Sequence, residues 1–295
     1  MVRNKTGTAR LSRGTLYLLM TVIAVLSLAP ILYTVAVSFS DKAAAAAGKV
    51  TLWPVGFNTF AYDTILNDKN FLGSFFISVK RVLVGGIINF VITVSMAYPL
   101  SRQVAEFRSR DLYMWFIIVT MLFSGGIIPL YILMKYLGMF DTIWALVLPT
   151  AVPVFNVILL MNFFRSIPKE LSEAGHIDGA GPWYMLMKVF IPLSTPALAT
   201  VTLFSIVSHW NSFFDGLVFM RSMDKYPLQT YIQQFVVQTN LQNVSSAEKI
   251  EMFKRLSNQT LNAAKIVIGM LPILLIYPFL QRYFIHGIML GSVKE

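Results

Sequence analysis

Long apolar runs dominate this sequence and limit what the chain can fold into. Each spans about 20 residues or more, enough for a helix to cross the roughly 30 Å of hydrocarbon in a bilayer. Only 13% of the 295 residues are charged, about half the share of a typical soluble domain. We therefore expect an all-α polytopic membrane protein with six transmembrane helices, at Leu16–Phe39, about Phe75–Leu100, Leu112–Tyr136, Thr142–Phe164, Pro192–Met220 and Ala263–Phe284.

The first apolar run has two interpretations. The alanines at 43–47 follow it and offer small residues at which a signal peptidase cuts. The run is nevertheless longer than the usual signal core of about 7–15 residues, and Pro30 interrupts it. We interpret it as a retained span that follows a cytoplasmic segment, residues 1–14.

The basic residues predict the orientation of the spans. With the N-terminus inside, the inner segments hold most of the arginines, whereas the longer outer segments mix lysines with aspartates and glutamates. Because basic loops stay on the cytoplasmic side, both termini are expected there. The same bias explains most of the net charge of +10. A nucleic-acid partner is therefore not needed to account for that charge. The inner bases are Arg3, Lys5, Arg10, Arg13, Arg102, Arg108, Arg110, Arg165, Lys169, Lys188, Arg282 and Lys294.

Few residues in this chain suit catalysis or metal binding. It has no cysteine, and its three histidines are scattered without the spacing of metal ligands. Gly48-Lys49 lacks the upstream glycine and the following Ser or Thr of a phosphate-binding loop. We expect no catalytic residue, no metal and no cofactor in this chain, so any nucleotide must bind elsewhere.

The segment between the fourth and fifth apolar runs, residues 165–191, has the clearest local signals. Pro168 suits the start of a short helix, and Glu170 and Glu173 then lie near the positive end of that helix. Gly179 suits a sharp turn after it, and Pro192 suits the first turn of the next span. These residues predict a rigid helix–turn–helix on the cytoplasmic side, which either docks a soluble partner or is merely a well-structured loop.

This segment resembles the EAA loop of ABC importer permeases. The family pattern is Glu-Ala-Ala, three residues, Gly, nine residues, then Ile-x-Leu-Pro. The chain has Glu173-Ala174-Gly175, then Gly179, then Val189-Phe190-Ile191-Pro192, with both spacings intact. It departs from the pattern at Gly175, Val189 and Ile191, and Gly175 in place of alanine is expected to loosen the helix.

The resemblance implies a cytoplasmic coupling helix that lies in a cleft of an ATPase subunit. Glu173 would contact a basic residue there; the implied coupling residues are Glu173, Ala174, Gly175, Asp178, Gly179 and Ala180. The implied partners are a second permease in a heterodimer, an ATPase homodimer or heterodimer that binds ATP and Mg²⁺, and an extracytoplasmic sugar-binding protein. The implied cellular location is the inner membrane.

The resemblance extends along the whole chain to the shorter permease of maltose-type sugar importers. Trp210-Asn211 is similar to a Trp-Asn motif of that family. Residues 286–295 resemble its cytoplasmic tail, and the tail residues expected to contact the ATPase are Gly291, Ser292 and Lys294. The run Gly125-Gly126-Ile-Ile-Pro129 favours the branch that imports larger oligosaccharides. In this architecture the partner permease often supplies most substrate contacts.

Charged and polar residues within the spans have two interpretations. Lys80, Arg81 and Lys135 either reach the outer interface or line the pathway, and a basic lining would favour an acidic oligosaccharide such as a uronate fragment. His209, Trp210 and Asn211 are further candidates for the pathway. A packed histidine and a packed or interfacial tryptophan are the alternatives.

The outer segment 221–262 is far longer than the 2–8 residues that usually connect two helices. By resemblance, its tip would reach into the binding protein and displace the sugar. The candidate contact residues are Gln238, Asn240, Gln242 and Asn243. The alternative is a solvated cap over the bundle.

Two other functions compete with an ATP-driven importer. A secondary transporter or channel would show inverted repeats, broken helices and acidic residues in mid-span. No convincing repeat is visible, and Asp215 is the one acid near the fifth span. An intramembrane enzyme would need paired acids or a Ser/His arrangement, which the spans lack. The sequence therefore favours the importer.

Overall fold

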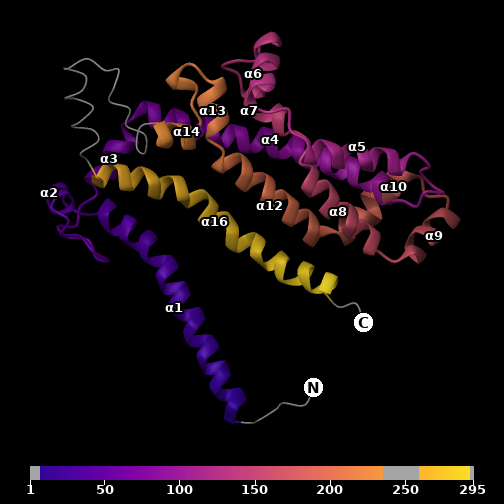
Figure 1. The fold of residues 1–295 in the computed structure, drawn as a ribbon, viewed down its shortest axis with the longest axis horizontal. Coiled ribbons are helices and arrows are strands. Elements are labelled where there is room, and N and C mark those ends of the chain that lie inside the picture. The colour runs from indigo at the N-terminus through magenta and orange to yellow at the C-terminus, as the bar shows by residue number, and fades with distance from the viewer. Residues whose placement is uncertain (1–6, 235–258, 293–295) are drawn as a thin grey trace. The chain divides into compact units, whose positions relative to one another are not determined.

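The computed structural model describes residues 7–234 and 259–292, with side chains for 12–234 and 259–278. The described part is helical and has no β-strand, and Figure 1 shows the path of the chain. In order, the elements are α1 Gly7–Ser38, α2 Lys42–Ala46, α3 Phe60–Leu66, α4 Lys69–Ser101, α5 Arg110–Leu122, α6 Ile127–Tyr136, α7 Ile143–Val147, η1 Leu148–Thr150, α8 Val154–Ser166, α9 Lys169–Ile177, α10 Pro182–Met185, η2 Leu186–Phe190, α11 Ile191–Leu193, α12 Thr195–Asn211, α13 Phe214–Phe219, η3 Met223–Lys225, α14 Leu228–Ile232 and α16 Gln259–Ser292.

Three single helices are long and apolar enough to cross a membrane. They are Ser12–Ser38 of α1, the whole of α4, and Gln259–Pro278 of α16. These helices coincide with the first, second and last predicted spans. The prediction of a membrane-spanning helix is confirmed for these three runs.

The other three predicted spans are bent or broken helices. The third run is α5 and α6, bent by 107°, and the fourth is α7–η1 and α8, bent by 47°. The fifth contains, near its start, an 84° bend between Pro182–Leu193 and α12. It breaks again at Ser212 and Phe213 before α13. The described chain has six candidate spans when each bent pair counts as one.

Local sequence explains where these runs break. Gly126, just before α6, has a φ of +82°, which an L side chain rarely adopts. Pro149 lies in η1, and Pro153 directly precedes α8. The helix breaks here because proline lacks an N–H and disfavours helix in the residue before it. Apolar content alone marks these stretches as spans, whereas glycine and proline decide that they bend.

The chain groups into two compact units, residues Met1–Lys69 with Gln234–Met270, and Asn70–Gln233 with Leu271–Glu295. In the first unit, the Ser38 hydroxyl lies 2.7 Å from the Tyr62 hydroxyl. Lys265 Nζ lies 3.6 Å from the Asp68 carboxylate, so a charged residue of the last apolar run has an acidic partner. A small core forms around Ala36, Val37, Ala45, Val50 and Ala263.

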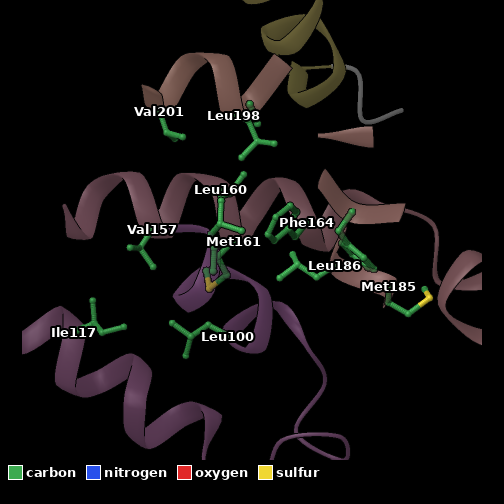
Figure 2. Packing of buried hydrophobic residues seen from close by; sticks show 14 residues of the cluster. Leu100, Ile117, Val157, Leu160, Met161, Phe164, Met185, Leu186, Leu198 and Val201 are labelled. Atoms are coloured by element: carbon green, nitrogen blue, oxygen red, sulfur yellow. The ribbon is translucent and has the colours of Figure 1, made fainter. Parts of the chain in front are cut away.

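The second unit contains the larger core, between α4, α5, α8 and α12 (Figure 2). On α8 the buried residues Val157, Leu160, Met161 and Phe164 recur at the three- and four-residue spacing of one helix face. Leu100 of α4 and Leu186 of η2 pack into the same cluster. This core joins α4, α5, α8 and α12 to the segment after α9.

Helices α4 and α12 approach closely at Gly85. A Cβ atom at Gly85 would lie 2.4 Å from Nε2 of the buried His209 ring, whereas nothing lies within 4 Å of a Cβ at the adjacent Gly86. We expect Gly85→Ala to destabilise the fold by about 1–3 kcal/mol, the usual cost of overpacking, and Gly86→Ala to be neutral or stabilising because alanine favours helix. Thermal unfolding of the two purified variants checks this. Equal melting temperatures would contradict the close approach.

Candidate coupling and pathway sites

The segment that resembles the EAA loop forms a short helix and a sharp turn. Helix α9 follows Pro168, and Asp178 caps its C-terminus. Gly179 then has a φ of +74°, a conformation that glycine adopts without strain. The predicted helix after Pro168 and the predicted turn at Gly179 are both confirmed.

Two backbone hydrogen bonds close this turn, and a side chain of α10 packs against it. The Ala180 N–H donates to the Gly175 carbonyl at 2.8 Å, and the Gly179 N–H donates to the His176 carbonyl at 3.1 Å. A Cβ atom at Gly175 would lie 2.4 Å from Sδ of Met185, which is buried in the large core. Where the family pattern has alanine, the missing methyl group leaves room for the Met185 side chain to pack against α9.

Arg102 ties α9 to the end of α4. Its guanidinium lies over the Phe190 ring at 4.2 Å and near the Tyr98 ring at 4.8 Å. One of its nitrogens donates to the Ser172 hydroxyl of α9 at 3.3 Å. Stacking on an aromatic face suits arginine because its planar cation is weakly hydrated. The sequence pattern marked Arg102 only as an inner base and missed this contact.

A cavity of about 330 Å³ lies beside α9, and Glu173 is among its lining residues. The charged residues that line it are Arg102, Glu106, Arg110, Arg165, Lys169 and Glu173. Glu173 itself is exposed, and so are the apolar side chains of Ile177 (86% exposed) and Trp183 (69%). Helix α9 lies at one end of the unit (Figure 1). Exposed charged residues, among them Lys169, Glu173 and Asp178, lie there together with exposed apolar side chains, a mixture that protein-docking surfaces also have.

Arg81 is not exposed in this structure, although we expected it to line a pathway or reach the interface. Its side chain is 1% exposed and forms an ion pair with Asp215 of α13. It also donates to the carbonyl oxygens of Ser212 at 3.2 Å and Leu146 at 3.3 Å. Arg81 therefore joins α4, α7 and the break between α12 and α13, and its charge is neutralised within the subunit.

The other candidate pathway residues differ in exposure. Lys80, Lys135 and Asn211 are exposed, and their roles stay predictions. His209 is buried, with Nε2 3.4 Å from the Asn89 side-chain oxygen. Trp210 is 4% exposed and packs edge-on against the Phe75 ring at 5.7 Å. These two placements fit the packed alternatives given above.

Two sets of candidate residues cannot be placed. Gln238, Asn240, Gln242 and Asn243 of the outer segment lie outside the described residues, as does Lys294. Gly291 and Ser292 belong to the last turn of α16, in the part where the structure describes no side chains. The roles of these residues stay predictions.

Residues 69–290 match the family of binding-protein-dependent transport system inner membrane components. The match covers most of the chain, and a bundle with an exposed EAA-type helix fits it. This chain belongs to that family and is a multi-pass membrane permease subunit.

Its relatives include sugar permeases. It is 36% identical to the polygalacturonan/rhamnogalacturonan transport system permease protein YtcP of Bacillus subtilis (strain 168), over 95% of this chain and 96% of that protein. It is 37% identical to Protein LplC of the same organism, over 92% and 91%. A chain in the crystal structure of a bacterial ABC transporter involved in the import of the acidic polysaccharide alginate is 33% identical. That chain superposes with a TM-score of 0.85, over 96% of this chain and 100% of its own length.

Proposed function

We propose that this chain is a transmembrane subunit of an ATP-dependent, binding-protein-dependent importer of oligosaccharides that contain uronic acids. Two relatives support the substrate class, since one is named for polygalacturonan and rhamnogalacturonan and the other belongs to an importer of alginate. The chain would form half of a heterodimeric pathway in the inner membrane, with both termini cytoplasmic as the basic residues predict. The secondary-transporter alternative has no such support.

The observation that carries the ATP-driven mechanism is the geometry of α9. This helix exposes Glu173 beside Ile177 and Trp183, while Arg102 and Met185 fix it to the helices of the bundle. A partner that binds α9 can therefore move the bundle. In our proposal two ATPase subunits close on ATP, shift α9 and favour the outward-facing state. The free energy comes from the tighter binding of ATP in that state.

The chain itself carries out no chemical step in this proposal. ATP and Mg²⁺ would bind to the partner ATPase, and an extracytoplasmic binding protein would deliver the sugar. Arg81 is paired with Asp215, so recognition of an acidic sugar would rely on other cations, of which Lys80 is a candidate in this chain.

The outer segment gives a test of the binding-protein contact. In proteoliposomes that contain the whole complex, deletion of residues 238–246 is expected to spare membrane insertion and basal ATP hydrolysis. Stimulation of hydrolysis by the sugar-loaded binding protein is expected to disappear, because the tip would no longer enter that protein. Full stimulation after the deletion would mean that the segment is only a cap.

A further inference from the structure

An uncharged hollow of about 560 Å³ opens between α4, α8 and α12. None of its lining residues is charged. They are Asn89, Pro149, Thr150, Val152, Pro153, Phe155, Asn156, Phe204, Ser205 and Ser208. The coupling surface at α9 and the Arg81–Asp215 pair contribute nothing to this lining, so the hollow is a separate feature.

The hollow lies deep within the membrane-spanning part of the chain. Asn89 precedes the end of α4 at Ser101 by about 18 Å at 1.5 Å per residue, and half the hydrocarbon thickness is about 15 Å. Amides and hydroxyls at this depth are costly against lipid. They are tolerated where they face a protein interior or a water-filled pathway.

The backbone gives independent support for a pathway here. The break between η1 and α8, with Pro149 and Pro153 on either side, lines the hollow. Irregular backbone at membrane depth persists only inside protein or beside a water-filled cavity. In secondary transporters, a different class of membrane carrier, discontinuous helices of this kind often form the binding site.

The polar groups of the hollow are held in place by contacts within the subunit. The Asn156 amide donates to the Val201 carbonyl and to the Ser205 hydroxyl, each at 3.2 Å. Because these bonds use both of its donor hydrogens, only its oxygen remains to accept from a ligand. The Asn89 oxygen contacts His209, which leaves the Asn89 amino group to donate. Acceptor and donor are thus fixed on different helices.

Two aromatic rings complete the lining. Phe155 is 57% exposed and Phe204 is 38% exposed, and their ring centroids lie 6.2 Å apart at an angle of 43°. Aromatic rings cover the apolar faces of sugar rings, while amides and hydroxyls bond to sugar hydroxyls. Exposed rings beside fixed amides match the two kinds of surface on a pyranose.

We propose that this hollow binds the hydroxyls and uncharged ring faces of the oligosaccharide as it crosses the membrane. The proposal rests on the proposed function and adds that this subunit itself contacts the substrate. A carboxylate placed in an uncharged hollow would lose its hydration without gaining a cation. The sugar carboxylates are therefore bound outside this hollow, by Lys80, the second permease or the binding protein.

The test compares Phe204→Ala and Ser208→Trp with the control Phe76→Ala, an exposed phenylalanine of α4 that does not line the hollow. Whole complexes in proteoliposomes are supplied with trigalacturonate or its neutral methyl ester. Phe204→Ala is expected to raise the half-saturation concentration of both sugars about tenfold, equivalent to about 1.4 kcal/mol. Ser208→Trp is expected to abolish uptake by filling the hollow. Stimulation of ATP hydrolysis by the loaded binding protein should persist in both variants.

Three results would overturn the inference. Uptake by Phe204→Ala and Ser208→Trp that matches the Phe76→Ala control would show that the hollow touches no sugar. A loss confined to the acidic sugar would show that the site recognises carboxylates. A wild-type complex that imports neither compound would refute the proposed substrate class, and the inference with it, so the two failures are distinguishable.

Discussion

Glu173→Lys is expected to uncouple the subunit from its ATPase while leaving the fold intact. Glu173 is exposed on α9, and no ion pair of the described chain involves it, so reversal of its charge removes no internal partner. Disruption of a charge pair buried at an interface costs about 2–5 kcal/mol. That cost corresponds to about 30-fold or more in affinity. Copurification of the ATPase and sugar-stimulated ATP hydrolysis should both fall.

Asp224→Lys is a matched control for this experiment. Asp224 is also exposed, but it lies in η3, in the segment predicted to be outside the cell membrane. The same charge reversal there should leave ATPase binding unchanged. If Glu173→Lys transports sugar as well as the wild type does, the role proposed for Glu173 is wrong.

Arg81→Met is expected to destabilise the subunit strongly. Removal of one partner from a fully buried ion pair typically costs about 3–5 kcal/mol, because the other charge is left uncompensated. Asp215 is 20% exposed and also accepts from Ser212 and Gly216, so we expect the lower end of that range. Two carbonyl oxygens that Arg81 contacts would lose their donor as well. Thermal unfolding of the purified protein in detergent measures the effect.

Two further variants distinguish the loss of the ion pair from the loss of any positive charge in this part of α4. Lys80→Met removes the neighbouring exposed charge and should change stability by no more than about 0.5 kcal/mol. The double variant Arg81→Met, Asp215→Asn removes both charges of the pair and should recover part of the loss. If Arg81→Met is as stable as Lys80→Met, the pair contributes nothing to the fold.

Local sequence predicted where the coupling helix α9 begins and ends, but not which residues it contacts. Pro168 and Gly179 predicted where α9 begins and turns, since both act through backbone conformation that neighbours do not change. The contact of Arg102 with Ser172 joins residues 70 positions apart. No local pattern predicts such a contact, because it depends on how α4 and α8 pack.

The sequence also carries a signal for the hollow. Asn89 and Asn156 are amides within two of the predicted spans, and amides in spans usually mark a polar interior. Which amides meet, and that Phe155 and Phe204 lie beside them, depends on the 47° bend at Pro149–Pro153. The two prolines indicated a break but gave no angle.

Sequence by itself determined that this chain is an all-helical membrane protein with six apolar runs, and that one loop resembles an ATPase-coupling segment. Hydropathy and backbone-restricting residues act locally, so they can be recognised without knowing the neighbours. Only the tertiary structure decided that Arg81 is buried against Asp215 rather than exposed. Its position in the apolar run was compatible with either environment, because the environment of a charged residue in a span is set by the helices that pack around it.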